Sequence, residues 1–417
     1  GAAAPVVEDA APPQGVERKT NEPETFEAMP PLTVISRGRT LIVDTDAGRS
    51  IACGKRLSEQ GLTCTLLVTK KAAAPDASPS RFDQFPLLEV DAVSITGAFG
   101  GFSAVVTARG DQRPLSERLG DEASVFDLVL DLQSTPSYAG ECLPMGYYAP
   151  GTNSADLPEV MAELPEMQGR FHRPQFTAFL KSRCFHGRSR THDCRRCVEV
   201  CPFGAIQSVD RAISIDHYRC QGCGGCAMVC PADAIHLVHP SREELQSILR
   251  ETLGDRLAGA APTLMISDSE SGDGRGFPGA DEPDHDRRVK FGVEQIGHAG
   301  LEMLLASLAY GAGAVVAACG SETPPKIREA AEREAQMGRA ILRGLGMTEE
   351  KIRFVVIPPD NARLEELTSP TAGHEAQPGR SLLPPTPFPP TPDKRTLIRL
   401  AAQYLYDQTG AAQPSIP

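Results

Sequence analysis

The chain has 417 residues, 38 glycines, 36 prolines and a formal net charge of −12. At ~150 residues per domain this length predicts two or three domains, and the acidic balance argues against a whole-chain nucleic-acid binder. There is no apolar run of the ~18 residues that a membrane-spanning helix needs and no signal-peptide pattern at the N-terminus. We therefore expect no membrane span and a reducing, cytoplasmic location.

The first third of the chain predicts an arm followed by a small α/β domain. Residues 1–37 are rich in Ala, Pro and Glu without a sustained period, which favours a flexible arm. Residues 39–69 predict strand, helix and strand, and residues 91–109 predict a hairpin around a Gly-rich turn. With a buried strand over 125–132, these elements indicate an α/β domain over residues 38–150.

Helices and strands alternate again beyond residue 240. The expected elements are helices over 241–257, 327–346 and 394–410, strands over 263–268 and 351–357, and a helix followed by a strand over 298–320. They predict a second α/β domain over residues 259–360. Acidic residues among glycines at 268–286 indicate an exposed loop. Residues 361–417 are expected to be a Pro-rich tail, extended in its PPTPFPPTP stretch, with a terminal helix.

Between these regions lies an internal repeat that holds most of the cysteines. Eight of the 12 cysteines fall between Cys184 and Cys230. CRRCVEVCPFGAI, from residue 194, matches CGGCAMVCPADAI, from residue 223, at an offset of 29 residues. With Cys220 the second copy reads C-x2-C-x2-C-x3-C-P, the bacterial pattern for cubane iron–sulfur clusters, in which the fourth cysteine ligates the other cluster.

The first copy departs from this pattern. Thr191 stands at the position equivalent to Cys220 and cannot ligate as a thiolate, and the next cysteine upstream is Cys184. We therefore assign eight ligands to two [4Fe–4S] clusters, one held by Cys184, Cys194, Cys197 and Cys230 and the other by Cys220, Cys223, Cys226 and Cys201. The sequence thus predicts a two-[4Fe–4S] ferredoxin domain over residues 168–240.

Alternatives for this segment stay open at this point. Zinc accepts CxxC pairs, although its structural sites have longer spacers between the pairs. His186 or His192 could replace Cys184 as a ligand, or a three-iron cluster could lack one corner. The histidine and three-iron alternatives concern the first cluster only, whereas zinc would replace both clusters.

The remaining four cysteines are scattered singly. Cys53 and Cys64 fit small core residues, and Cys142 lies in a loop with no predicted role. Cys319 lies at the carboxyl end of a predicted strand, where open α/β sheets place ligands, but no second Cys or His is near it in sequence.

A basic stretch surrounds the first copy of the repeat. It contains Arg170, Arg173, Lys181, Arg183, Arg188, Arg190, Arg195 and Arg196 against a single acid. We expect an acidic redox partner to dock on Arg183, Arg188, Arg190, Arg195 and Arg196, steered by charge. The alternative is that these cations only offset the charge of anionic clusters.

The segment CFHGRSRTHDCRRCVEVCPFGAI…CQGCGGCAMVCPADAI resembles a family of bacterial 4Fe–4S proteins of the kind encoded with molybdenum- or tungsten-dependent formate dehydrogenases. The resemblance covers roughly residues 120–360 and includes FDLVLDLQSTP and VEQIGHAGLEMLLASLAYGAGAVV. It implies formate dehydrogenase as a partner, and its C-x9-C spacing favours Cys184 as a ligand. Members commonly continue into a second ferredoxin-like module, so we expect this chain to be a shortened form.

We therefore expect α/β flanking domains with an inserted α+β bacterial two-[4Fe–4S] ferredoxin-like domain. The predicted function is non-catalytic transfer of single electrons between a redox enzyme and a carrier, with no catalytic residues. A flavin- or nucleotide-dependent oxidoreductase subunit is one alternative. However, the turn at residues 44–50 has one glycine where a dinucleotide fingerprint needs three. An assembly factor with structural clusters is the other alternative.

Overall fold

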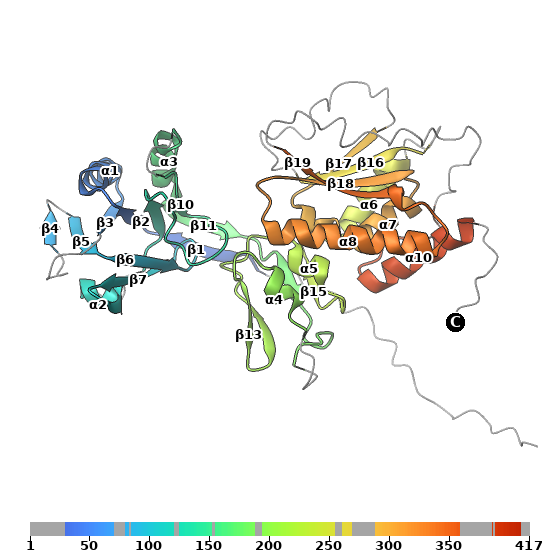
Figure 1. The fold of residues 1–417 in the computed structure, drawn as a ribbon, viewed down its shortest axis with the longest axis horizontal. Coiled ribbons are helices and arrows are strands. Elements are labelled where there is room, and N and C mark those ends of the chain that lie inside the picture. The colour runs from blue at the N-terminus through green and yellow to red at the C-terminus, as the bar shows by residue number, and fades with distance from the viewer. Residues whose placement is uncertain are drawn as a thin grey trace, which may run out of the picture.

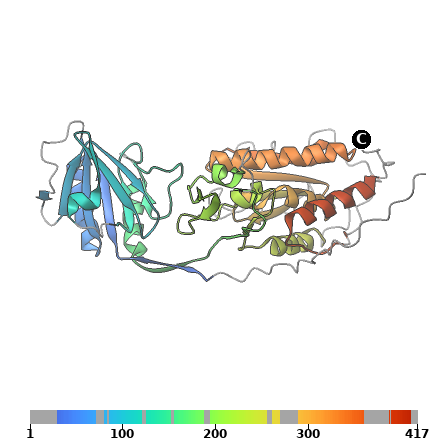
Figure 2. The same cartoon turned by 90° about the horizontal axis from the view of Figure 1, so that it is seen from below.

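The computed structural model describes residues 30–70, 80–82, 85–120, 125–151, 155–187, 194–254, 261–268, 288–358, 386 and 388–409. These residues form two lobes that follow one another along the long axis of the molecule (Figure 1). Seen from below, the cysteine-rich segment, coloured green, lies at the inner end of the second lobe (Figure 2).

The first lobe is built on a six-stranded sheet with the order β10-β9-β2-β3-β5-β4. Its strands are β2 (Arg39–Asp44), β3 (Thr63–Thr69), β4 (Ser80–Phe82), β5 (Phe85–Val90), β9 (Leu128–Asp131) and β10 (Tyr147–Tyr148). Neighbouring strands are parallel except β4 and β5. Helix α1 (Ala47–Glu59) joins β2 to β3, and the Asp46 carboxylate caps it by accepting two backbone N–H groups. The strand–helix–strand prediction for residues 39–69 is confirmed.

The two faces of this sheet carry different elements (Figure 1). Helices α1 and α3 (Leu157–Glu163), followed by the 3-10 helix η1 (Leu164–Met167), pack on one face. The other face carries the antiparallel strands β6 (Ala92–Thr96), β7 (Ser103–Ala108) and β8 (Asp111–Pro114), with helix α2 (Leu115–Leu119). The predicted hairpin is confirmed in β6 and β7. Gly97, at φ +112°, allows its turn, because a Cβ there would lie 2.3 Å from the Gly101 carbonyl oxygen.

The end of the predicted arm is ordered, which corrects the boundary at residue 37. Strand β1 (Leu32–Ser36) pairs antiparallel with β11 (Gly169–Arg173). Residues 1–29 lie outside the described part of the chain. A five-residue strand is stable only with a partner, and this partner lies more than 130 residues away, so local sequence could not reveal it.

The cysteine-rich segment contains two short helices and two pairs of antiparallel strands. The helices are α4 (Arg196–Val200) and α5 (Gly225–Val229). The strand pairs are β12 (Thr177–Phe179) with β15 (Ile235–Leu237), and β13 (Ile206–Val209) with β14 (Ala212–Ile215). Helices α4 and α5 lie against each other, so the two copies of the repeat meet in space.

The second lobe has a four-stranded parallel sheet with the order β17-β16-β18-β19. Its strands are β16 (Thr263–Asp268), β17 (Arg288–Val293), β18 (Ala314–Gly320) and β19 (Ile352–Ile357). Its helices are α6 (Arg242–Gly254), η2 (Ile296–His298), α7 (Leu301–Ala309), α8 (Pro325–Gly344) and η3 (Glu349–Lys351). The expected helices and strands of this region are confirmed. The predicted acidic loop, apart from Asp268, lies outside the described residues.

The described part of the predicted tail belongs to the core of the second lobe. Helix α10 (Lys394–Thr409) packs on α7 and buries Leu397, Ala401 and Leu405. Phe388, from the Pro-rich stretch, is 7% exposed and its ring centroid lies 5.5 Å from that of Tyr310. For these residues the expectation of a separate tail is wrong, because apolar side chains at helical spacing find a matching face on α7.

Residues from the cysteine-rich segment and the second lobe share one hydrophobic core. Val200 and Ile235 belong to the same buried cluster as Leu264 and Leu304. Helix α5 contacts both α8 and η2. Among the described residues, no helix combines the length and the apolar character needed to span a bilayer.

Candidate metal centre

The two copies of the cysteine repeat have nearly the same backbone. Helix α4 ends at Cys201, with φ −73° and ψ 109°, and α5 ends at Cys230, with φ −73° and ψ 111°. A proline follows each of these cysteines and cannot continue the helix hydrogen-bonding pattern. The chain therefore turns away from each helix immediately after the last cysteine.

The repeat also places equivalent residues at equivalent strand positions. Ile206 begins β13 and Ile235 begins β15, and both are buried, at 4% and 1% exposure. The alanine before each isoleucine is buried as well. The two copies thus form a pair of matching units, with their cysteine loops held by the same kind of core contacts.

The first predicted ligand set meets around Cys197. Burial raises the pKa of the Cys197 thiol to about 12, and Cys230, Cys184 and Cys194 raise it further because a second thiolate would repel the first. Three of these cysteines precede or lie in α4, whereas Cys230 comes from the second copy. The structure therefore brings together the four cysteines that the sequence assigned to one cluster.

The second predicted set meets around Cys223 and Cys226. Burial raises the pKa of Cys223 to about 12, with further increases from Cys201 and Cys220. Burial also raises the pKa of Cys226 well above its ordinary value, and Cys223, Cys220 and Cys201, followed by Cys197, raise it further by repulsion. A cavity is lined by Cys201, Cys220, Cys223 and Cys226 together with apolar side chains such as Phe203 and Ile215.

Backbone amides point at several of the sulfurs. The Ala234 N–H donates to Cys230 Sγ at 3.3 Å, and the His186 N–H donates to Cys184 Sγ at 3.4 Å. A hydrogen bond from the Gly225 amide lowers the pKa of Cys223 against the effect of burial. Donors of this kind stabilise thiolates and tune the potentials of bound clusters.

This donor set fits iron–sulfur clusters chemically. Burial, and then repulsion between neighbouring thiolates, raises the pKa of thiols such as Cys197 and Cys226, and cationic iron would remove that repulsion while releasing the protons. Within the described ranges, no three His, Cys, Asp or Glu side chains converge closely enough to hold a single metal ion. In a cubane cluster each thiolate binds its own iron, so the ligands surround the cube and do not meet at one point.

His186 has another role in this structure. Its ring nitrogens lie 2.9 Å from the Cys194 carbonyl oxygen and 2.8 Å from Ser208 Oγ. Both nitrogens therefore have partners that tie the Cys184 loop to the first copy and to β13. His192 and Thr191 lie outside the described residues.

The predicted basic docking surface is only partly exposed. Arg173 is 8% exposed and donates to the carbonyl oxygens of Tyr218 and Cys220. Arg183 pairs with Asp393 at 3.1 Å and lies 3.7 Å from Asp233. Arg183 is therefore paired with acids that are distant in sequence, while its side chain keeps an exposure of 35%.

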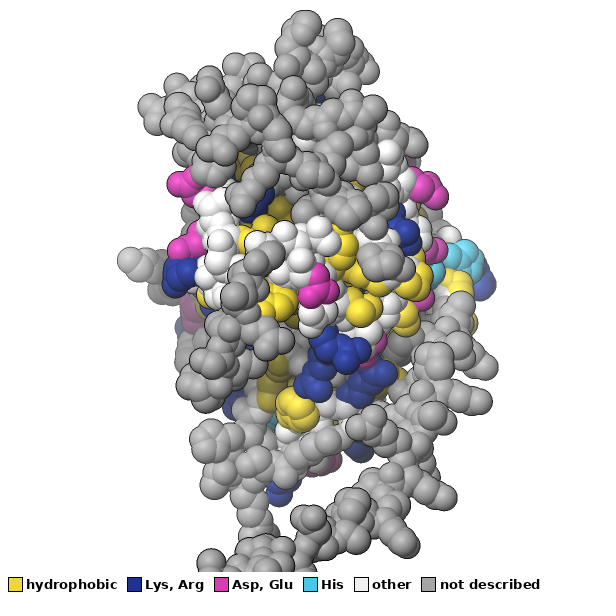
Figure 3. Space-filling view, turned by 90° about the vertical axis from the view of Figure 1, so that its right-hand side faces the viewer, with side chains coloured by type: hydrophobic (Ala, Val, Ile, Leu, Met, Phe, Trp, Pro, Cys, Tyr) yellow, Lys and Arg dark blue, Asp and Glu magenta, His cyan; other side chains and the backbone are white. Residues whose placement is uncertain are grey.

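Other members of that basic stretch remain on the surface. Arg195 and Arg196 are exposed, and Arg188 and Arg190 lie outside the described residues. On the end face of the second lobe, basic side chains gather beside hydrophobic ones (Figure 3).

The structure places Cys142 near the second set of cysteines, a position that no sequence signal indicated. Burial raises its pKa, and Glu141 and Cys201 follow as further causes, so the thiol lies beside the second set. Glu141 pairs with Lys326 of α8 at 2.6 Å and ties this loop of the first lobe to the second lobe. Only the packing of the two lobes brings Cys142 to this position.

The other single cysteines are core residues. Cys53 and Cys64 are 8% and 3% exposed, in agreement with the prediction. Cys319 is fully buried, and burial raises its pKa to about 12. A thiol of this kind is inert at neutral pH.

The turn after β2 is filled by its own side chains. Asp44 accepts from the Arg49 guanidinium, with Oδ2 2.7 Å from Nε, and Arg49 also donates to the Leu132 carbonyl oxygen at 3.0 Å. Asp131, at the end of β9, accepts from Tyr147 Oη at 2.6 Å. These groups lie at the carboxyl edge of the sheet, the edge at which open α/β sheets bind ligands, and they are paired with one another.

Comparison with known proteins identifies the cysteine-rich segment. Residues 190–240 match the LdpA Fe-S cluster-binding domain. Over 44 residues the chain is 41% identical to a protein of the ion-translocating oxidoreductase complex of Methanosarcina acetivorans, a match that covers 11% of this chain and 17% of that protein. Over 53 residues it is 40% identical to the PorD component of pyruvate synthase from Methanothermobacter marburgensis, covering 13% and 62%.

A further match is an uncharacterized ferredoxin-like protein, YdhY of Escherichia coli, with 47% identity over 45 residues, 9% of this chain and 22% of that protein. The chain spans about a fifth of the length of YdhY and of the Methanosarcina protein. The matches and the paired cysteine loops lead to one conclusion: the chain carries an iron–sulfur cluster-binding segment that is similar to ferredoxin-like proteins.

Proposed function

We propose that this protein carries two [4Fe–4S] clusters and passes single electrons between a redox enzyme and a carrier. The proposed ligands are Cys184, Cys194, Cys197 and Cys230 for one cluster and Cys201, Cys220, Cys223 and Cys226 for the other. Residues 168–240 are the proposed ferredoxin-like domain, inserted between the α/β lobes.

One observation carries this proposal: the last cysteine of each copy lies with the other copy's set. Cys230 neighbours Cys197, while Cys201 neighbours Cys223. This exchange is the arrangement of two-cluster ferredoxins, in which the cysteine before the proline ligates the other cluster. A pair of independent single-ion sites has no need for such an exchange.

For the partner, we propose a redox enzyme of the formate dehydrogenase type, which the sequence resemblance implies. Two relatives support a redox partner in general, since one is named as part of an ion-translocating oxidoreductase complex and the other as part of pyruvate synthase. Arg195 and Arg196 are the described cations available for docking beside the first set.

The test is anaerobic reconstitution with iron and sulfide. We expect about eight irons and eight sulfides per chain, because each cubane cluster holds four of each. Cys197→Ser should reduce the iron content to about half by removing a ligand of one cluster. Cys319→Ser is the matched control, since its thiol is fully buried and the side chains that affect its pKa include none of the proposed ligands, and should keep the full content. A colourless protein that holds only zinc would contradict the proposal.

A further inference from the structure

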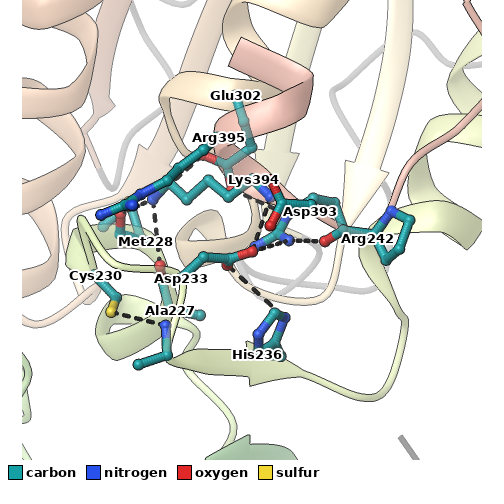
Figure 4. Close-up of polar contacts among 12 residues, drawn as sticks. Ala227, Met228, Cys230, Asp233, His236, Arg242, Glu302, Asp393, Lys394 and Arg395 are labelled. Atoms are coloured by element: carbon teal, nitrogen blue, oxygen red, sulfur yellow. Dashed lines mark hydrogen bonds and ion pairs between the residues drawn. The ribbon is translucent and has the colours of Figure 1, made fainter. Parts of the chain in front are cut away.

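Charged side chains are buried where α10 meets the loop that follows α5 (Figure 4). Lys394, the first residue of α10, and Glu302 of α7 are each 5% exposed, and Asp233 is fully buried. Arg242, at the start of α6, has a side chain that is 11% exposed. Burying charges is costly unless they are paired with good geometry, so the arrangement calls for an explanation.

Lys394 contacts the cysteine-rich segment directly. Its Nζ donates to the carbonyl oxygens of Ala227, at 3.3 Å, and Met228. It also lies 3.4 Å from Glu302 Oε2. Its backbone N–H donates to Asp233 Oδ2 at 2.8 Å. Both the backbone and the ammonium of Lys394 are therefore fixed against this one loop.

The position of Lys394 relates it to both proposed clusters. Ala227 and Met228 lie between Cys226 and Cys230. Cys226 belongs to one proposed ligand set and Cys230 to the other. The ammonium is thus held against the short helix α5, which contains Cys226 and is followed directly by Cys230.

The surrounding residues keep the ammonium in place. Arg242 donates to both carboxylate oxygens of Asp233, at 2.9 and 3.3 Å. Arg242 Nε also lies 3.6 Å from Glu302 Oε1. Arg395 donates to the Pro231 carbonyl oxygen at 2.9 Å. Asp233 and Arg395 therefore attach the start of α10 to the loop on both sides of Lys394.

A buried charge at this place acts on reduction. Each cluster becomes more negative by one charge when it gains an electron, and a nearby cation stabilises that state more strongly in a medium of low dielectric constant than in water. Net charge around a cluster is one of the factors that set its potential. Glu302 acts with the opposite sign from the same location.

We propose that Lys394 raises the reduction potential of the clusters and that Glu302 lowers it, so that this buried ion pair sets the working potential. The inference rests on the proposed function, since it requires the clusters. One electron enters a cluster from an external reductant, no bond breaks, and Lys394 keeps its proton. Lys394 thus acts on the clusters only through its charge and contacts no substrate.

The test compares midpoint potentials in the reconstituted full-length protein, titrated with dithionite and followed by electron paramagnetic resonance. Lys394→Met should lower the mean midpoint, changing the equilibrium constant for reduction by about tenfold, which is about 59 mV for one electron. Glu302→Gln should raise it. Lys394→Arg keeps the charge and should leave it close to the wild-type value.

Arg343→Gln, on α8, is the matched control, since it breaks an exposed pair with Glu349 of η3 and should leave the midpoint unchanged. Opposite shifts in Lys394→Met and Glu302→Gln support the proposal, because a merely structural ion pair would loosen the same contact in both variants. Shifts of the same sign, or none, overturn it. Wild-type protein that takes up no iron and sulfide would overturn the proposed function itself, before any potential is measured.

Discussion

At the scale of single residues, His298 has an unusual environment. The side chain is 4% exposed, and neither ring nitrogen has a hydrogen-bond partner within the described structure. Burial lowers its pKa from 6.5 to about 4, because the charged imidazolium would lose its hydration without gaining a partner. The residue is therefore neutral in the folded protein at neutral pH.

This environment predicts a loss of stability in mild acid. Between about pH 4 and pH 6.5 the unfolded chain binds a proton at His298 that the folded chain does not. The contribution of His298 to the free energy of unfolding is therefore fully present above pH 6.5. It decreases as the pH falls towards 4, by at most about 3 kcal/mol. His298→Leu should show less of this decrease, measured as the free energy of unfolding in urea at pH 7.5 and pH 5.

The control is wild-type protein reconstituted in the same way, because acid also protonates sulfide and cysteine ligands in both proteins. An equal pH dependence in both would contradict the interpretation of His298.

At the scale of elements, the two repeat copies differ at one turn position. Gly204 and Asp233, which are 29 residues apart in sequence, both have positive φ, at 60° and 51°. Glycine adopts this conformation without strain, whereas aspartate there costs about 1 kcal/mol. The second copy accepts this cost because the Asp233 carboxylate pairs with Arg242 and holds the start of α10.

Substitutions at these two positions should separate strain from charge pairing. Asp233→Asn keeps the shape of the side chain but removes the charge that pairs with Arg242. We therefore expect the free energy of unfolding to fall by about 3 kcal/mol. Gly204→Ala has open space around its Cβ and should cost only about 1 kcal/mol through backbone strain. Urea unfolding of both variants measures the difference, and an unchanged free energy of unfolding in Asp233→Asn would show that the carboxylate charge contributes nothing.

At the scale of the whole molecule, the lobes meet at the cysteine-rich segment. Strand β11 runs from the first lobe, and Arg173 at its end donates to the carbonyl oxygens of Tyr218, at 3.1 Å, and Cys220, at 3.0 Å. Burial lowers the pKa of Arg173. A guanidinium buried on backbone carbonyls is a structural clamp and not a docking residue.

This contact predicts different effects for two arginines of one strand. Arg173→Gln should destabilise the Cys220 loop by about 2 kcal/mol, since two buried carbonyl groups lose a charged donor, and should speed the release of iron to a chelator. Arg170, exposed on the same strand, is the matched control, and Arg170→Gln should release iron at the wild-type rate. Equal rates in the two variants would contradict the clamp.

Much of the candidate site was predictable from local pattern. The repeat and its prolines are visible in the sequence, and the proposed crosswise pairing of ligands follows from spacing, since three thiols on one short loop cannot supply four corners. Strands such as 263–268 and the hairpin at 91–109 also follow from local periodicity, because buried runs and turn glycines act over a few residues.

Other features required the tertiary structure. The pairing of β1 with β11, the position of Cys142 beside the second set, and the burial of Lys394 against Ala227 and Met228 all join segments far apart in the chain. Sequence alone placed Arg173 and Arg183 in a surface patch, because it shows charge but not which carbonyl or carboxylate a folded chain brings to it. Local chemistry thus indicated an iron–sulfur cofactor, because the spacing of thiol ligands is written in the sequence, whereas long-range packing decided which charges surround those thiols.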